Sequence, residues 1–473
     1  MQQHLRSNPR SNPRTGDGTR AALYALCVGF FMIGLDATVV NVAIPAVRTS
    51  LHAGLDAMVW VNSAYALCYA VPLLLTGRLG DRFGPKRVFL AGLAGFTAAS
   101  LACALAPTAG VLIAARAVQG LAAALIAPQA MAVIVHMFPA ERRGRPLGVW
   151  SAVGALSMAA GPLVGGLAVA TLGWRGIFLV NLPIGAAGWV AARRLVPDHR
   201  PAVRHRFDPL GIALSATGLF ALVFAVQSGA HYDWGQVAGP VSITRLLVLA
   251  VVCLAAFVLW QHRNPREPLL PLRLFRDRDF TAASTAGAAM GCAMGGLFLP
   301  LMVYFQDTLG CTALQAGAAT VPMFALSSLC ARWAGRRADT VSPRLLAAAG
   351  FATTAAGLAA LLLLLHPGVS LWTLLPPLLV CGIGIGGISA PLAGIATRSL
   401  RPGLTGAASG VFTTTRQLGG ALGSAATGLI LQSHPGGTTT TATQAALVFP
   451  VAALLAGLAC CAAVRARPVA ARA

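Results

Sequence analysis

The chain has 473 residues, of which 56% are hydrophobic and only 10% are charged. A soluble globular protein carries about 25% charged residues, so the composition excludes an ordinary soluble enzyme and predicts a chain with most of its surface in lipid. The net charge is +22, from 35 Lys and Arg against 13 Asp and Glu. This excess could indicate a nucleic-acid-binding protein, and the positions of the basic residues decide that question.

Fourteen apolar stretches are long enough to cross a bilayer as helices. A hydrocarbon core of about 30 Å needs roughly 20 residues at a rise of about 1.5 Å each. In chain order the predicted spans are 21–47, 57–76, 88–106, 109–136, 147–171, 176–196, 209–229, 241–260, 280–305, 313–333, 345–366, 371–396, 404–431 and 442–464. We therefore predict an all-α integral membrane protein with fourteen transmembrane helices.

The two ends of the chain are polar. Residues 1–20 contain a tandem Ser-Asn-Pro-Arg repeat and are predicted to form a disordered cytoplasmic tail, and residues 465–473 form a second cytoplasmic tail. The first segment has too few hydrophobic residues for a signal peptide. The ten Cys residues show no metal-ligand spacing, so they are interpreted as small apolar packing residues and no metal site is predicted.

The basic residues support this topology. With a cytoplasmic N-terminus, 30 of the 35 fall in tails and loops on the cytoplasmic side. Only Arg48, Arg175 and Arg245 fall on the outer side, while Arg116 and Arg416 lie within spans. This asymmetry is typical of a multi-pass protein of the inner (plasma) membrane with both termini in the cytoplasm. The positive charge is therefore explained by an anionic leaflet, and no nucleic-acid partner is predicted.

A segment beside the second span recurs 258 residues later, where GRLGDRFGPKR from Gly77 is matched by GRRADTVSPRL from Gly335. The matched pairs are Gly77 with Gly335, Arg78 with Arg336, Asp81 with Asp339, Pro85 with Pro343 and Lys86 with Arg344. Many secondary transporters are built from such duplicated halves. The repeat predicts two six-helix bundles, over residues 21–196 and 280–464, joined by a linker with two inserted helices over residues 197–279.

Six short motifs follow one another along the chain: LDATVVNVAIP, GRLGDRFGPKR, RAVQG, GALSMAAGPLVGG, WRGIFLVNLPIG and RQLGGALG. Through these motifs together the chain resembles the major facilitator superfamily and, within it, the fourteen-helix drug:proton antiporter family. The motifs are dense in the first six spans and sparse in the second half. The resemblance implies the major facilitator fold and transport of a small molecule against protons, without a cofactor and without an enzymatic reaction.

Asp36 is the strongest candidate for proton coupling. It is the only carboxylate inside a predicted span, where an ionised carboxylate is costly and a proton should be exchanged readily. Arg116 lies at a similar depth, about 10 Å from the outer end of its helix, and could face Asp36. The resemblance implies that Asp36 accepts the proton coupled to substrate release and that Arg116 takes part in its transfer. A structural ion pair, or an Arg bonded to carbonyls, is the alternative.

The loop motif supplies a predicted gate. Asp81 lies between basic residues at a tight turn, where it could favour the N-terminus of a neighbouring helix. The resemblance implies that this loop holds the outward-open state and does not contact the substrate. The gating residues are Gly77, Arg78, Asp81, Arg82, Gly84 and Arg87.

The fifth span carries the motif that the resemblance associates with exporters. Its small residues and proline should bend the helix and let a partner helix pack closely. These residues are Gly154, Gly161, Pro162, Gly165 and Gly166. Polar residues at mid-depth are candidates for the transport cavity, and an unpaired Arg there would favour anionic or neutral groups. The candidates are Asn41, Gln119, Arg416 and Gln417.

The sequence as a whole predicts a proton-coupled antiporter that exports small amphipathic drugs or antibiotics, acting as a monomer in the lipid bilayer. A GxGxxG pattern at Gly382, Gly384 and Gly387 lies in an apolar span without a preceding strand, so no dinucleotide site is predicted. Two alternatives stay open. One is a proton-coupled symporter that imports small solutes, and the other is a transporter-like membrane sensor.

Overall fold

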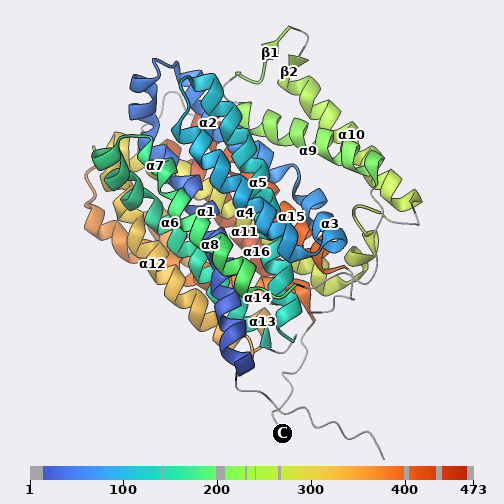
Figure 1. Cartoon of the computed structure of the whole chain (residues 1–473). Helices are drawn as coiled ribbons and strands as arrows, with labels where there is room; N and C mark the ends of the chain where they lie inside the picture. The colour runs from blue at the N-terminus through green and yellow to red at the C-terminus, as the bar shows by residue number, and fades with distance from the viewer. Residues whose placement is uncertain are drawn as a thin grey trace, which may run out of the picture.

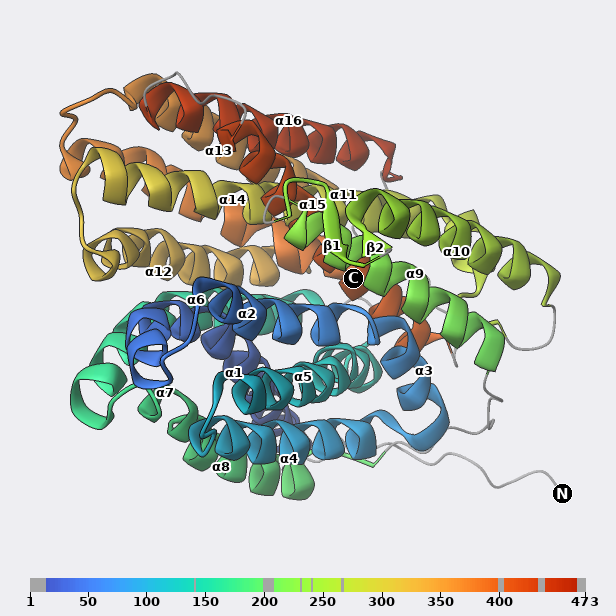
Figure 2. The same cartoon turned by 90° about the horizontal axis from the view of Figure 1, so that it is seen from above.

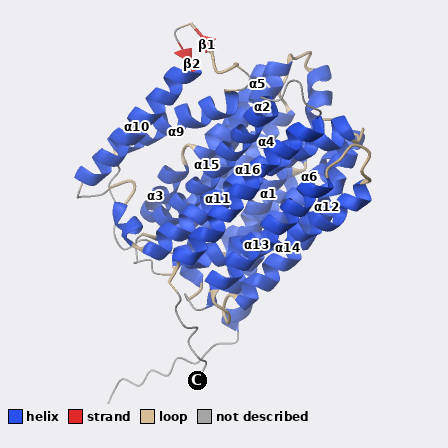
Figure 3. Cartoon of the chain, turned by 180° about the vertical axis from the view of Figure 1, so that it is seen from behind, coloured by secondary structure: helices blue, strands red, loops and turns tan. Residues whose placement is uncertain are grey.

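The computed structural model describes residues 14–139, 142–198, 208–229, 232–239, 241–264, 268–398, 404–432 and 439–465. These residues are almost entirely helical (Figures 1 and 3). Residues 1–13 and 466–473, which contain most of the two predicted tails, lie outside the described part. A two-stranded antiparallel hairpin, β1 (Gln236–Ala238) and β2 (Val241–Ser242), is a small exception to the predicted all-α fold.

The helices of the first half lie side by side in one bundle (Figure 2). They are α1 (Arg14–Ser50), α2 (Leu55–Ala70), α3 (Leu73–Phe83), α4 (Pro85–Ala104), α5 (Ala109–Met137), α6 (Gly144–Leu172), α7 (Gly176–Leu179) and α8 (Asn181–Leu195). Small residues let these helices approach closely. Gly92 of α4, for example, lies against Ala122 and Leu125 of α5, where a Cβ would meet the Leu125 side chain at 2.8 Å.

The second half forms the other bundle, and two further helices lie between the halves in sequence. The inserted pair is α9 (Pro209–Ser228) and α10 (Ile243–Arg263), followed by a 3-10 turn, η2 (Leu272–Arg276). The second bundle contains α11 (Arg278–Val303), a π-helical turn η3 (Tyr304–Thr308), α12 (Ala313–Arg337), α13 (Pro343–Leu364), α14 (Leu371–Thr397), α15 (Thr405–Gln432) and α16 (Thr439–Ala463). In Figure 2 this bundle packs face to face with the first.

Twelve helices among the described residues are long and apolar enough to cross a membrane. They account for twelve of the predicted spans. The two remaining predicted spans correspond to the α2–α3 pair and to α15. The α2–α3 span is broken because Pro72 has no backbone N–H and begins a new helix, so neither piece reaches spanning length alone. α15 packs along α11, with Gly291 against the backbone of Arg416 and Gly420.

The predicted loop after the second span is wrong for most of its length. Gly77, Arg78, Asp81 and Arg82 lie inside α3, and the turn is confined to Gly84, whose φ of 90° suits glycine. Arg87 already belongs to α4. The tight turn that the sequence indicates is therefore one residue long, because Pro85 occupies the first position of the next helix.

The inserted helices α9 and α10 form a helical hairpin, which we call the inserted hairpin. It lies along the seam between the two bundles. Val223 and Phe224 of α9 pack in one apolar cluster with Leu67 of α2, and Leu418 and Ala421 of α15 join this cluster. α10 packs on α9 and presents an apolar outer face, including Val251, which is 67% exposed. α9 therefore contacts helices from both halves, while α10 lies on the periphery.

Candidate functional site

A cavity of about 580 Å³ lies between the two bundles. Its wall comes from α1, α2, α5 and α6 of the first half and from α11, α12, α14 and α15 of the second. Val223 and Gln227 of α9 complete it. The wall is largely apolar, with the stacked rings of Phe298 and Phe324 at 5.5 Å, and it carries a small number of polar groups. A concave, mainly apolar site with a few polar groups is typical of small-molecule binding.

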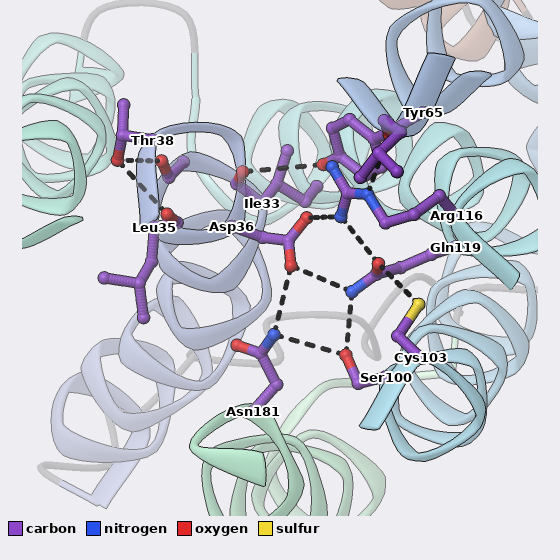
Figure 4. Close-up of polar contacts among 12 residues, drawn as sticks. Ile33, Leu35, Asp36, Thr38, Tyr65, Ser100, Cys103, Arg116, Gln119 and Asn181 are labelled. Atoms are coloured by element: carbon purple, nitrogen blue, oxygen red, sulfur yellow. Dashed lines mark hydrogen bonds and ion pairs between the residues drawn. The ribbon is translucent and has the colours of Figure 1, made fainter. Parts of the chain in front are cut away.

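Asp36 lies immediately behind this wall at the centre of a buried polar network (Figure 4). Arg116 Nη1 donates to Asp36 Oδ2. The other oxygen, Oδ1, accepts from Gln119 Nε2 at 2.9 Å and from Asn181 Nδ2 at 3.2 Å. Ser100 Oγ accepts from the same two amides, at 2.7 Å and 3.2 Å. The three contacts of the carboxylate, from Arg116, Gln119 and Asn181, are thus all hydrogen bonds that it accepts, which favours its charge in this apolar interior.

Arg116 connects the network to the cavity. It is 1% exposed, yet it belongs to the residues that line the cavity. Its Nε donates to the Val61 carbonyl at 3.3 Å, and its guanidinium carbon lies 4.2 Å from the centre of the Tyr65 ring. These contacts hold the guanidinium between Asp36 and the cavity.

The predicted cavity residues do not all face the cavity. Arg416 and Gln417 of α15 line it. Gln119 does not: it is fully buried in the Asp36 network, where its amide oxygen accepts from Arg116 at 2.7 Å. Asn41 belongs to α1, and its side chain lies outside the described part of the structure.

The predicted gating residues lie at one end of the molecule, which we call the Asp81 end and which carries Asp81, Gly84 and the first turns of α6 and α15. Asp81 accepts hydrogen bonds from the backbone N–H groups of Gly406 and Ala407, at 2.9 Å and 3.0 Å. These groups open α15, so the carboxylate binds the N-terminus of a helix of the other half, as the sequence suggested. The backbones of Gly77 and Gly406 touch beside this contact.

The basic gating residues contact other segments. Arg78 donates from Nε to the Leu269 carbonyl at 3.1 Å, and its Nη2 donates to the Pro268 carbonyl. Arg82 lies over the Phe83 ring, 5.3 Å from its centre. Arg87 forms a loose ion pair with Asp198 at 3.9 Å. Arg78 therefore connects α3 to the segment after α10, and Arg87 connects α4 to the segment after α8. The contact of Arg82 with Phe83 is between neighbours in the sequence.

The repeated motif forms the same contact on the opposite side of the seam. Asp339 follows α12 and accepts from the backbone N–H groups of Gly144 at 2.9 Å and Arg145 at 3.2 Å. These groups open α6. Gly335 and Gly148 touch through their backbones beside it. Two carboxylates, one from each half, thus bind helix N-termini of the opposite half at the Asp81 end.

The motif in α6 packs against two different helices. A Cβ at Gly154 would fall 2.7 Å from the Phe30 ring, and Gly161 and Gly165 lie against Thr38 and Val39, so these three glycines face α1. Pro162 touches Gly317, and Gly166 lies next to Leu314, so these two face α12 of the other half. α6 is therefore in close contact with the helix that carries Asp36 and with the partner bundle.

Several site residues were not predicted from the sequence. Ser100 and Asn181 belong to α4 and α8, which are distant in sequence from Asp36, and only a polar side chain within an apolar run marks them. Asn181 lies in the WRGIFLVNLPIG motif, so that signal was present. Nothing in the sequence marked Val223 and Gln227 of α9 as cavity residues. They belong to a segment inserted between the two bundles, and the sequence does not indicate that this segment reaches the cavity.

Comparison with known proteins agrees with this architecture. Residues 26–424 match the Major Facilitator Superfamily. The chain is 38% identical over 415 residues to the methylenomycin A resistance protein of Streptomyces coelicolor, covering 86% of this chain and 85% of that protein. It is 36% identical over 417 residues to the cephamycin export protein of Amycolatopsis lactamdurans, with 87% and 84% covered.

A solved structure shares the fold at low sequence identity. The crystal structure of a human organic anion transporter superposes with a TM-score of 0.66 at 15% identity, covering 95% of this chain and 100% of that chain. At this identity the similarity shows the fold alone. The family match covers most of the chain, and both bacterial relatives are resistance or export proteins. The chain therefore belongs to the major facilitator superfamily, and its relatives within that superfamily include antibiotic resistance and export proteins.

Proposed function

We propose that the chain exports small amphipathic drugs or antibiotics from the cytoplasm in exchange for protons. One observation carries this proposal: a fully buried carboxylate, Asp36, is ion-paired with Arg116, which itself lines a cavity shared by both halves. Addition of a proton to Asp36 would remove this ion pair and alter the charge at the cavity wall. The bacterial relatives that are named for resistance and export support the outward direction.

The proposed cycle uses two conformations. Cargo enters from the cytoplasm while Asp36 is ionised and the Asp81 end is open. Closure of that end, by the contacts of Asp81 and Asp339 with the opposite half, carries the cargo to the outer side. A proton from outside then neutralises Asp36 and releases Arg116 from its ion pair, and the cargo leaves on the outer side. The proton leaves on the cytoplasmic side.

The proton supplies enough free energy for this exchange. One charge crossing a membrane gains about 2.3 kcal/mol per 100 mV. At about 150 mV one proton therefore supplies about 3.5 kcal/mol, which sustains a several-hundredfold gradient of a neutral cargo. A nucleotide-driven step is not needed.

We place the protein in the inner (plasma) membrane as a monomer with both termini in the cytoplasm. Fourteen crossings are proposed, twelve by the long apolar helices and two by the α2–α3 pair and α15. The proposed division of the chain is a first bundle over residues 21–196, a linker with the inserted helices over 197–279, and a second bundle over 280–464. The basic Asp81 end then faces the cytoplasm. No chemical conversion of the cargo is proposed.

The decisive variant is Asp36→Asn, which keeps the size of the side chain and removes its charge. We expect it to reach the membrane at the normal level and to reduce proton-dependent efflux at least tenfold, because no proton can be exchanged at this position. A growth-inhibition panel across antibiotic classes identifies cargo, and efflux is then followed in proteoliposomes with an internal pH dye. Asp307→Asn, the same change at an exposed carboxylate, is the control. Normal pumping by Asp36→Asn would contradict the proposal.

The same vesicles separate the two alternatives. Antiport predicts that cargo added to acid-loaded vesicles releases protons. A symporter predicts that cargo and protons move in the same direction. A membrane sensor predicts no cargo movement, no proton movement and no effect of Asp36→Asn or Arg116→Gln on either.

A further inference from the structure

The charges on the cavity wall do not balance. Among the described residues that line the cavity there are two arginines, Arg116 and Arg416, and no Asp or Glu. The charge of Arg116 is compensated by Asp36 behind it. Within the described part of the chain, Arg416 makes no ion pair and its side chain makes no hydrogen bond; its polar neighbour is Tyr69, which interacts with it electrostatically. The cavity thus holds one uncompensated positive charge.

Arg416 cannot move this charge to water at either end of its helix. It lies about 17 Å along α15 from Thr405 and about 24 Å from Gln432, beyond the reach of an arginine side chain. Its backbone is held in place, because the Arg416 carbonyl lies against Gly291 of α11. A guanidinium fixed at this depth is expensive without a partner, and a residue that remains there is expected to serve a ligand.

We propose that the exported cargo is an amphipathic organic anion whose carboxylate or similar acidic group pairs with Arg416. This inference rests on the proposed transport function and names its substrate class. A guanidinium binds a planar carboxylate through two parallel hydrogen bonds, which gives orientation as well as affinity. The apolar body of the cargo then lies against the stacked rings of Phe298 and Phe324. Gln227, whose amide oxygen has no hydrogen-bond partner in the described structure, accepts from a donor group of the cargo.

If the cargo is an anion, its charge determines how the proton on Asp36 and the cargo at Arg416 affect each other's binding. Protonation of Asp36 leaves Arg116 without its counter-charge, so the wall then carries two positive charges instead of one. A proton on Asp36 and an anion at Arg416 therefore favour each other within one conformation. Exchange in opposite directions has to come from the alternation of conformations and not from repulsion between the proton and the cargo.

An anionic cargo also makes export strongly dependent on membrane voltage. Export of a monoanion against one entering proton moves two charges in the favourable direction. For a neutral cargo each 100 mV sustains a gradient of about 50-fold, and for a monoanion about 2,000-fold. Voltage alone is then sufficient to drive accumulation outside the cell.

The test uses three probes of the same size and different charge: 9-anthracenecarboxylate, the neutral 9-anthracenecarboxamide and the cationic 9-(aminomethyl)anthracene. Binding to the purified full-length protein in lipid nanodiscs is measured by fluorescence anisotropy. We expect the carboxylate to bind at least tenfold more tightly than the other two. Arg416→Gln should reduce carboxylate affinity at least tenfold and amide affinity less than threefold. Arg416→Lys should retain the preference for the anion, and it keeps the test informative if the glutamine variant does not fold.

The control is Arg337→Gln, which removes an exposed arginine from the end of α12 and should leave all three affinities unchanged. Equal affinity for the three probes, a preference for the cation, no measurable binding of the carboxylate, or an unchanged preference in Arg416→Gln would each overturn the proposal. Binding in nanodiscs needs no transport, so the binding assay tests the anion preference alone. Failure of the exchange function would instead appear as proton flux that is insensitive to Asp36→Asn.

Discussion

Two charged side chains inside the helical bundles, Asp36 and Arg416, differ in how many partners they have. Each oxygen of Asp36 accepts from a side chain that is itself buried, and the donors come from α5 and α8. Among the described residues, Arg416 has no comparable set of partners. A charge whose hydrogen-bond partners are all supplied by the protein is stabilised without a ligand. A charge that lacks such partners is stabilised only when a ligand supplies them. At the residue scale, the first arrangement suits reversible protonation and the second suits cargo binding.

A third charged side chain, Asp208, supports structure. It caps α9, and it accepts from the Gly211 N–H at 2.9 Å, from Trp260 Nε1 at 2.8 Å and from Gln261 Nε2 at 2.7 Å. Burial raises the pKa of this carboxyl, but these hydrogen bonds outweigh burial and hold the pKa below its ordinary value. Trp260 and Gln261 belong to α10, so the carboxylate joins the two inserted helices.

Asp208→Asn is expected to lower the melting temperature in detergent by several degrees at pH 7.5. The amide places an N–H₂ group opposite a donor, a loss of about 1–3 kcal/mol. Because the pKa of the wild-type carboxyl is lowered, its stabilisation is complete above the ordinary carboxyl pKa and is lost only as the pH falls through the lowered value. The difference in melting temperature should therefore be constant from pH 8 to pH 5. A difference that disappears between pH 8 and pH 6 would contradict this assignment, and Asp307→Asn serves as the control.

The candidate site was predictable from the sequence only in part, for a physical reason. A lone carboxylate or arginine in an apolar run is conspicuous, because the bilayer penalises it. Asp36, Arg116 and Arg416 were found in this way. The amide and hydroxyl partners of Asp36 are penalised much less and resemble ordinary polar packing residues, so Asn181 and Ser100 were identified only once the fold brought α4 and α8 to α1.

At the scale of elements, two carboxylates at the Asp81 end bind helix N-termini of the opposite half, and we propose that they hold this end closed. Asp81→Asn should weaken the contact with α15, because the amide carries no charge to complement the helix dipole. A contact of this kind contributes about 0.3–2 kcal/mol. Amide hydrogen exchange of the 404–412 segment should rise about 2- to 30-fold, as measured by mass spectrometry on the protein in nanodiscs.

The duplicated contact supplies the matched comparison. Asp339→Asn should accelerate exchange at the start of α6, over residues 144–150, and Asp81→Asn should accelerate exchange at the start of α15. If neither variant changes exchange at its own helix, the contacts do not hold this end closed. Exposed Asp307→Asn should change neither segment.

The helices show which features could be predicted from the sequence pattern and which could not. Long apolar runs gave the spans with their approximate ends, because length and hydropathy are local properties. The GRLGDRFG segment was expected to be a loop because it is rich in Gly and charge. It is nevertheless helical to Phe83, since Gly77 packs against Gly406 and Asp81 binds the N-terminus of α15. These contacts come from the other half of the chain, and local sequence does not contain them.

At the scale of the whole molecule, the inserted hairpin is part of the transport site. The sequence predicted the insertion between two bundles, and it offered no means of placing α9 against both α2 and α15. That position depends on where the two bundles leave a gap, which is a property of the assembled fold. Val223 and Gln227 therefore line the cavity although the hairpin is absent from the repeat.

A larger side chain at Val223 tests this placement. Val223 is 2% exposed and lines the cavity, so Val223→Trp should narrow it and exclude large cargo. Resistance to the largest compounds of the growth-inhibition panel should fall at least tenfold while resistance to the smallest changes less than threefold. Val251→Trp makes the same change on the exposed face of α10 and is the control. A uniform loss for all compounds, at normal membrane abundance, would place Val223 outside the specificity wall.

The paired carboxylates at the Asp81 end affect how often this end can open. Opening requires release of two contacts, that of Asp81 with α15 and that of Asp339 with α6, which lie on opposite sides of the seam and act as two latches. If each latch disfavours opening about tenfold, independent latches disfavour it about a hundredfold, since their free energies add. Loss of either contact would then make this opening about tenfold more frequent without unfolding the protein.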